Sequence, residues 1–422
     1  MDPVTPGGRI DVPGDGFREL DRGALDRLGG VSGEGEHGPV VVGVGVHVEE
    51  GSAARRREPI DDVTAAPFRH VRHALEHQHR LRRQVPPHVG CEVLRVGLAL
   101  PQYDYSVPGE SPLRWDTLQD YAQRAEALGF DSLWLSDHLF LDIAKYGGSA
   151  EPQGVYEPIV TLAALARTVT RPRLGTLVAC EALRPASVLA KALATLDRIC
   201  GGRLDVGLGA GWYEPEYEAV GLAFPPPGER LARLAEAVDV VCGLLGGGPL
   251  TFEGRYHRAA GAVNRPPAVQ EPRPPVFVGG KGDRLIQLAV EHADGWNTCW
   301  VWTPDAYRDR LDVVERSCDK VGRDPATVWR SLGLYALAGE DRNDLERRFA
   351  RMRDVMPAGV VNGTLDEWRK GRLVGTVDEL RAQRDEWEAL GVETLILGPG
   401  PLPFSVTSLD DVELLAHALI SS

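Results

Sequence analysis

The stretch Ser132-Leu-Trp-Leu-Ser-Asp-His138 decides the fold that we predict for this chain. Its Leu-Trp-Leu centre is too apolar for a half-exposed strand and is typical of a central parallel strand, which is buried on both faces. An amphipathic run at 113–128, just upstream, predicts a helix that ends at Gly129. Because α/β folds place their active sites at the carboxyl ends of parallel strands, Asp137 and His138 are candidates for a site mouth.

The same alternation of apolar strands and amphipathic helices continues from about residue 94 to the end of the chain. We expect strands at 96–100, 131–136, 174–179, 203–208, 275–278, 295–298, 328–337 and 393–397. We expect helices at 113–128, 157–169, 185–199, 229–245, 282–292, 304–322, 342–356, 376–390 and 408–420. Eight strand–helix units predict an α/β fold, the (β/α)8 TIM barrel, with insertions at its C-terminal face at 140–155 and 249–274. An open doubly wound sheet is the alternative, but the G-x-G-x-x-G motif that would follow its first strand is missing.

Residues 1–92 differ in composition from the barrel domain that we expect at 93–422. All nine tryptophans and all ten tyrosines lie beyond residue 92, and the first segment has no lysine. We predict a weakly ordered extension rich in Arg, Gly, Pro and His, because this composition buries too little apolar surface to fold. A mis-assigned start of the coding region is the alternative. The histidines at 70–79 lack the acidic or cysteine partners of a metal site, so we predict no metal.

The overall composition argues against several classes of function. A net charge of −14 disfavours a nucleic-acid partner. No apolar run approaches the roughly 18 residues of a membrane span, and the first residues lack the pattern of an export signal. The six cysteines are scattered without a CxxC pair, which indicates reduced thiols. We therefore expect a cytoplasmic protein that acts on a small molecule.

Two glycine-rich strand ends are candidates for cofactor contacts. Gly279-Gly-Lys-Gly282 lies between an apolar strand and a helix, where backbone N–H groups and the helix N-terminus favour a phosphate. An ordinary glycine turn is the alternative there. The stretch Gly207-Leu-Gly-Ala-Gly-Trp212 could leave one strand face free of side chains for a flat ring, or it could allow close packing of neighbouring elements.

Polar residues after the second and third strands are candidates for chemistry. His138 has an imidazole suited to general acid–base catalysis, although a structural hydrogen bond at a strand end is the alternative. Asp137 either contacts a ligand or orients its neighbours. Glu181 and Arg184 could form a salt bridge with each other.

Taken together, these stretches resemble the bacterial luciferase-like monooxygenase superfamily, in particular its branch that depends on the deazaflavin coenzyme F420. The resemblance covers about 94–420, and its motifs are specific only in combination. The matching stretches are Gly97–Pro101, Gly129–His138, Leu174–Val178 with Arg184-Pro185, Leu189–Asp197 with Gly201-Gly-Arg203, Gly207–Trp212 with Glu216-Tyr217, Pro275–Gly280, Ala293–Asn297, Gly375–Glu379 and Gly391–Leu397.

The resemblance implies an oxidoreductase that transfers a hydride between coenzyme F420 and a small organic substrate at the barrel mouth. It implies that His138 donates or accepts a proton, with Asp137 beside it, and that a non-prolyl cis peptide bond at Leu177-Val178 or next to it presses on the ring. The cofactor-binding residues that it implies are Thr176, Leu177, Val178, Gly209, Gly211, Trp212 and Glu216 along the ring and tail, and Gly279, Gly280 and Lys281 at the phosphate.

The segment Glu181-Ala-Leu-Arg-Pro185 departs from the family pattern, which usually has an aromatic residue before Arg-x-Pro. Glu181 and Trp300 are therefore our candidates for substrate contacts. The resemblance also implies a homodimer. Two alternatives stay open: a monooxygenase that uses reduced FMN and O2, and a non-catalytic flavin-binding barrel.

Overall fold

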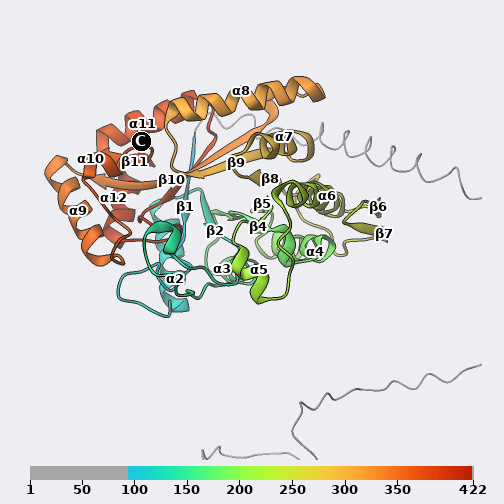
Figure 1. Ribbon diagram of the computed structural model, residues 1–422, viewed down its shortest axis with the longest axis horizontal. Coiled ribbons are helices and arrows are strands. Elements are labelled where there is room, and N and C mark those ends of the chain that lie inside the picture. Colours follow the sequence, from blue (N-terminus) through green and yellow to red (C-terminus); the bar gives the residue numbers. More distant parts are fainter. Residues whose placement is uncertain (1–93, 421–422) are drawn as a thin grey trace, which may run out of the picture. The chain divides into compact units, whose positions relative to one another are not determined.

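The protein is represented by a computed structural model, which describes residues 94–420. Within that range, eight parallel strands close into a barrel surrounded by helices (Figure 1). The barrel strands in chain order are β1 (Arg95–Ala99), β2 (Ser132–Leu135), β3 (Arg173–Thr176), β5 (Leu204–Gly209), β8 (Val276–Gly279), β9 (Gly295–Trp300), β10 (Trp329–Gly339) and β12 (Thr394–Gly398). The sheet closes because β1 pairs with both β2 and β12. The predicted TIM barrel is confirmed, while the expected extension at 1–92 lies outside the described residues.

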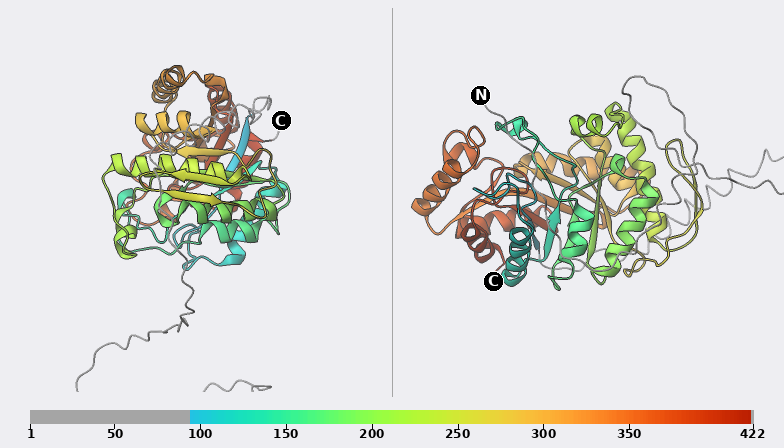
Figure 2. Two further views of the ribbon diagram at one scale, coloured as in Figure 1. Left: turned by 90° about the vertical axis from the view of Figure 1, so that its right-hand side faces the viewer. Right: turned by 90° about the horizontal axis from the view of Figure 1, so that it is seen from below.

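The helices between the strands cover the outer face of the barrel, as two further views show (Figure 2). They are α2 (Trp115–Leu128), α3 (Pro158–Leu165), α4 (Ala186–Ile199), α5 (Glu214–Ala219), α6 (Pro227–Leu245), α7 (Asp283–His292), α8 (Pro304–Val321), α9 (Arg342–Val355), α10 (Leu365–Trp368), α11 (Val377–Ala389) and α12 (Leu409–Leu419), with 3-10 turns η2 (Ala144–Tyr146), η3 (Glu181–Leu183) and η4 (Pro325–Thr327). Helix α2 ends where predicted, because Gly129 adopts φ 92° and its N–H caps the last turn. No helix in the described part of the chain is long and apolar enough to cross a membrane.

Four short strands differ from the prediction. The expected third strand stops at Thr176 and resumes as β4 (Ala179–Cys180). The excursion at 249–274 contains a hairpin of β6 (Leu250–Glu253) and β7 (Arg258–Ala262), whose mostly exposed residues give no clear apolar alternation. Strand β11 (Leu373–Thr376) pairs with the second half of the long strand β10 and extends the sheet beyond the barrel.

The stretch that decided the fold is buried on both faces, as predicted. Leu133 and Leu135 are fully buried in the core beneath the helices. Trp134 is fully buried in a separate cluster inside the barrel, where its ring meets Phe277 edge-on at 5.7 Å. Phe277 in turn meets Trp329 at 5.1 Å. These rings fill the barrel interior, so the barrel is a packed core and its opening lies at the strand ends.

A buried ion pair lies beside β8 and β9 and gives a test of stability. Arg273 donates to both carboxylate oxygens of Asp294 at 2.6 and 2.9 Å, and Val276 N donates to the same carboxylate at 2.7 Å. Burial acts to raise the pKa of Asp294, but the Arg273 guanidinium and the Val276 N–H outweigh it and hold the pKa below its ordinary value.

We predict that Arg273→Met lowers the free energy of unfolding by about 3–5 kcal/mol, because it leaves the Asp294 carboxylate buried and unpaired. The folded pKa of Asp294 is depressed, so its contribution to stability is present above the ordinary pKa of about 4 and is lost as the pH falls through the lower folded value. Urea denaturation from pH 7 down to pH 3 measures both effects. Arg258→Met, at an exposed pair with Glu253, is the control and should change stability by less than about 0.5 kcal/mol.

Candidate active site

His138 follows β2 and is held by a carboxylate from α5. Its Nδ1 lies 3.0 and 3.2 Å from the two carboxylate oxygens of Glu216, whose side chain is 1% exposed. Leu139 N also donates to Glu216, at 3.0 Å. Because an ionised carboxylate only accepts hydrogen bonds, we assign the proton of the neutral imidazole to Nδ1. Nε2 is then the ring nitrogen available to a ligand.

Aromatic side chains surround the His138 imidazole. The ring centroids of Tyr103, Trp212 and Tyr213 lie 6.5, 5.6 and 6.1 Å from that of His138. Trp212 is 43% exposed, whereas Tyr103 is buried, so Trp212 lies at the opening. The imidazole therefore stands between an apolar interior and an accessible indole.

The Asp137 carboxylate accepts hydrogen bonds from protein groups beside it. Its carboxylate accepts Cys180 N at 2.8 Å and both terminal nitrogens of Arg184, at 2.6 and 3.1 Å. Asp137 is 3% exposed. The sequence left two roles open for it, contact with a ligand or orientation of its neighbours, and these hydrogen bonds fit the second. The expected Glu181–Arg184 salt bridge is wrong, because Arg184 pairs with Asp137 and Glu157. Asp137 thus ties the end of β2 to the segment that follows β3.

A non-prolyl cis peptide bond joins Leu177 to Val178, as the resemblance implied. The Val178 methyl groups occupy the space where side chains of Gly209 and Gly279 would begin, 2.5 and 2.8 Å from their ideal Cβ positions. The interpretation of the glycine-rich end of β5 as an open flat face is therefore wrong, because protein atoms also fill the space beside Gly211. These glycines allow close packing, and their contact with a cofactor stays a prediction.

The glycine turn after β8 has the predicted location but fewer free donors than expected. Gly280 adopts φ 152°, a backbone conformation that side chains disfavour. Its N–H donates to Asn297 O at 2.9 Å, so this amide is not available to a phosphate. The Lys281 ammonium lies 5.2 Å from the centroid of the Trp302 ring. The turn therefore offers a ligand the positive charge of Lys281 and the backbone amides that follow Gly280. Its role in binding a phosphate stays a prediction.

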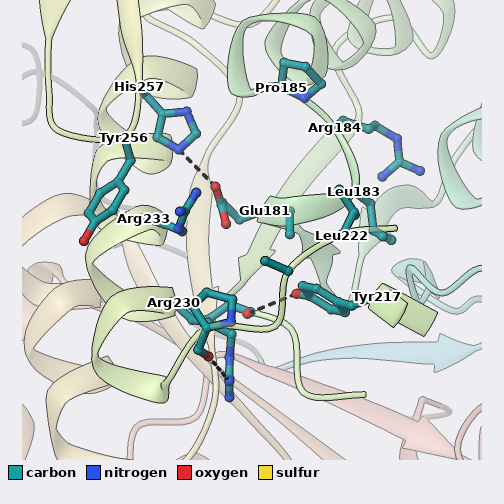
Figure 3. A pocket seen from close by; sticks show the side chains of 14 residues that line it. Glu181, Leu183, Arg184, Pro185, Tyr217, Leu222, Arg230, Arg233, Tyr256 and His257 are labelled. Atoms are coloured by element: carbon teal, nitrogen blue, oxygen red, sulfur yellow. Dashed lines mark hydrogen bonds and ion pairs between the residues drawn. The ribbon is translucent and has the colours of Figure 1, made fainter. Parts of the chain in front are cut away.

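A pocket of about 460 Å³ opens beside the ends of β4 and β5 (Figure 3). It is lined by Glu181, Ala182, Leu183, Arg184, Pro185, Ala210, Tyr217, Leu222, Ala223, Pro225, Arg230, Arg233, Tyr256 and His257. Helix α6, the turn of the β6–β7 hairpin and η3 supply seven of these 14 residues. Figure 3 shows Glu181 and His257 pointing toward each other, at 3.0 Å between the carboxylate and Nε2.

The pocket has an excess of positive charge. Arg230 stacks on Phe224 at 4.0 Å and donates to Pro225 O at 2.6 Å, and it has no carboxylate partner among residues 94–420. Its buried Nε has no hydrogen-bond partner. Arg233 contacts the ring of Tyr256 at 4.7 Å and pairs with Glu229, which lies outside the lining. An uncompensated guanidinium in a pocket is a binding element for phosphate or carboxylate.

Sequence reasoning missed this pocket. The signal that could have found part of it is the spacing of Arg230 and Arg233, because residues three apart on a helix share a face. The contribution of His257 could not be found, since the hairpin that carries it was itself not predicted.

The two predicted substrate residues lie in different places. Glu181 is buried in the pocket beside His257, whereas Trp300 is not part of the pocket lining. Trp300 ends β9, stacks on Tyr335 at 5.3 Å and meets Phe404 edge-on at 5.5 Å. A single small substrate touching both residues is therefore not supported by the lining of this pocket.

Comparisons with known proteins agree with the fold and the strand-end motifs. Residues 95–394 match the family described as luciferase-like monooxygenase. A F420-dependent glucose-6-phosphate dehydrogenase of Nakamurella multipartita is 35% identical over 49% of this chain and 59% of its own length. A 5,10-methylenetetrahydromethanopterin reductase of Methanolobus tindarius is 27% identical over 62% of this chain and 71% of its own length. The first of these matches thus spans about three fifths of the relative.

Among solved structures, a coenzyme F420-dependent tetrahydromethanopterin reductase from Methanopyrus kandleri superposes with a TM-score of 0.59. The two chains are 20% identical, and the alignment covers 78% of this chain and 98% of the reductase. At this identity the likeness supports the barrel fold and carries no statement about ligands.

We predict that neutral His138 carries its proton on Nδ1, because Glu216 accepts it. 15N NMR of histidine-labelled protein reports this tautomer directly. Glu216→Ala should shift the population toward the Nε2–H form, while His257→Ala, which removes the histidine–glutamate pair with Glu181, should leave the His138 signals unchanged. An Nε2–H form in the unmodified protein would contradict the assignment.

Proposed function

Because the chain belongs to the luciferase-like monooxygenase family, we propose that it is an oxidoreductase that transfers a hydride between coenzyme F420 and a small organic substrate. The observation that carries the proposal is the His138–Glu216 pair at the mouth of the barrel, with the exposed Trp212 ring centred 5.6 Å from the imidazole. The F420-dependent relatives support the choice of cofactor. F420 supplies the hydride carrier when it is bound, and the protein supplies position and proton transfer.

The residues at the mouth fit a flat deazaflavin ring. Val178, seated against Gly209 and Gly279, gives the strand ends an apolar surface, and Trp212 adds an exposed aromatic wall. Thr176 is fixed below them by a hydrogen bond from its hydroxyl to Gly207 O at 2.9 Å. We propose that Thr176, Leu177, Val178, Gly209, Gly211 and Trp212 together form the ring site.

The pocket beside this surface fits the anionic tail of the cofactor. F420 carries a phosphate and glutamate carboxylates, and the pocket offers Arg230, whose buried Nε lacks a partner, together with Arg233. Ala210 links the two regions, since it lines the pocket and directly follows Gly209. We propose that the tail binds here. The alternative site for the phosphate is the glycine turn of Gly279, Gly280 and Lys281, which the resemblance implied.

The protein's part in the reaction is to hold and move a proton. Glu216 fixes the orientation of the His138 ring and stabilises the imidazolium, so Nε2 can give a proton to the substrate oxygen or take one from it. Asp137 acts through its neighbours, because it fixes Arg184 and the Cys180 amide. Asp137 is therefore a positioning residue.

Trp300 packs against aromatic neighbours at the end of β9, and we retain it as a proposed substrate contact. We propose that Glu181 contacts the cofactor tail or orients His257. The insertions at 140–155 and 249–274 form walls of the site. A homodimer, which the resemblance implied, and a cytoplasmic location, which the composition predicted, complete the proposal.

We predict that the purified protein binds F420 more tightly than FMN, as measured by F420 fluorescence and FMN absorbance, and consumes no O2 with the reduced cofactor. His138→Ala should lower the rate of hydride transfer by about 10²–10⁴-fold, because the proton transfer loses its donor, while the Kd for F420 changes little. Preference for FMN with O2 uptake would favour the monooxygenase alternative. Cofactor binding without turnover of any substrate would favour the non-catalytic barrel.

We also predict that Arg230→Ala with Arg233→Ala weakens F420 binding by about a hundredfold or more, because each of the two lost charge-assisted hydrogen bonds contributes about 1.5–3 kcal/mol. The same variant should bind the deazaflavin riboside, which lacks phosphate and glutamates, as the unmodified protein does. Arg258→Ala on the exposed part of the hairpin is the matched control. Equal affinity of the double variant for F420 would place the tail elsewhere.

A further inference from the structure

The arginine pocket, the cavity lined by Arg230 and Arg233, also contains a carboxylate. Glu181 is the first residue of η3, is 6% exposed and is the one acidic residue among the 14 that line the cavity. The arginine nearest to it along the chain, Arg184, is already paired with Asp137. The negative charge of Glu181 therefore opposes the attraction between an anionic ligand and the pocket arginines.

His257 is the basic residue that contacts this carboxylate within residues 94–420. Its Nε2 lies 3.0 Å from a carboxylate oxygen of Glu181, and Figure 3 shows the two side chains directed toward each other. The imidazole is 15% exposed and lines the same cavity. Because histidine is the side chain that changes its charge near neutral pH, the net charge of the Glu181–His257 pair depends on one proton.

The hairpin turn holds His257 beside the pocket independently of Glu181. The turn between β6 and β7 is bound to α6 by the Glu236 carboxylate, which accepts Tyr256 N at 2.7 Å and His257 N at 2.9 Å. Arg255 N donates to the other oxygen of Glu236 at 2.9 Å. The backbone of the turn therefore positions the imidazole, and the pocket need not rearrange when a proton binds to it.

The other charged and titratable side chains of the pocket and the turn keep a constant charge near neutral pH. They are Arg184, which follows η3, and Tyr217 on α5. Helix α6 and the hairpin turn add Arg230, Arg233, Glu236, Arg255 and Tyr256. Arginine, tyrosine and glutamate side chains ordinarily keep one charge state between pH 6 and pH 8. His257 is therefore the member of this set whose charge changes in that range.

An anion in the pocket and a proton on His257 favour each other. A sphere of about 460 Å³ is about 10 Å across, so a bound anion lies within about one Debye length of the lining side chains. With neutral His257 the pair carries the negative charge of Glu181, which repels the anion, and with protonated His257 the pair has no net charge. Because such coupling is reciprocal, the anion must also draw a proton onto the imidazole.

We infer that the arginine pocket binds the anionic tail of the cofactor together with one proton, which His257 takes up from solvent. This inference rests on the proposed function, because it places the tail in this pocket. Protonation of His257 neutralises Glu181, so F420 binds more weakly as the pH rises from 6 to 8. The tail does not supply the proton, because a phosphate diester and glutamate carboxylates are ionised throughout this range.

The test is a calorimetric titration of the full-length protein with F420 at pH 7, in two buffers of different ionisation enthalpy, which measures the protons taken up. The deazaflavin riboside, which lacks the tail, reports the protons exchanged by the ring and by His138. We expect F420 to take up more protons than the riboside, by at most about one per molecule. Between pH 6 and pH 8, the affinity for F420 should fall at least about threefold relative to that for the riboside.

Two variants separate this role from a merely structural one. His257→Gln keeps a hydrogen-bond donor but cannot gain a charge, so the excess proton uptake should vanish. Glu181→Gln removes the repelling charge and should bind F420 at least about threefold more tightly at pH 8, whereas loss of a structural contact would weaken binding. His292→Gln, at a pair with Asp239 outside the pocket lining, is the matched control and should behave as the unmodified protein.

Four results would overturn the inference. Equal proton uptake with F420 and with the riboside would mean that the tail binds without a proton, and the proposed oxidoreductase function would stand. Excess uptake that persists in His257→Gln would place the proton on another group. Weaker F420 binding by Glu181→Gln at pH 8 would mean that this carboxylate does not oppose the tail. If neither F420 nor the riboside binds, the proposed function fails and the inference fails with it.

Discussion

The side chain of Trp134 inside the barrel is the constraint on which the rest of the structure depends. Its indole fills the interior at β2, and the neighbouring strands β1 and β3 accommodate it with Gly97 and Gly175, whose ideal Cβ positions lie 2.6 and 2.2 Å from atoms of the Trp134 side chain. The indole N–H is satisfied locally by Ser132 Oγ at 2.9 Å. Because the interior is packed by rings, ligands can approach only at the strand ends, where chemistry-bearing residues are found.

Strand ends by themselves are mobile, and polar contacts between consecutive units hold them in this protein. Asp137 joins the end of β2 to Arg184 and to the Cys180 amide, and Glu216 joins His138 to α5. Both carboxylates are nearly inaccessible to water, so these contacts are stronger than they would be at the surface. The imidazole is therefore oriented before any ligand arrives, which is the condition for efficient proton transfer.

Charge is distributed unevenly around this rigid centre. The chain is strongly acidic overall, yet Arg230 in the pocket lacks a carboxylate partner among residues 94–420, and its buried Nε has no hydrogen-bond partner. A buried guanidinium nitrogen without a partner costs stability, so its retention in a pocket supports an anionic ligand there.

The sequence by itself determined the barrel, the two-sided burial of 132–135 and the location of His138 at a strand end, because these follow from local apolar periodicity and strand order. Through the family resemblance it also placed a cis bond at Leu177-Val178 or next to it, and the structure has the bond at Leu177-Val178. Only the tertiary structure decided what each polar group contacts: Asp137 pairs with Arg184, and the space beside Gly209 is filled by Val178. The arginine pocket joins residues far apart along the chain, and side-chain direction across such distances is fixed by packing and not by local pattern.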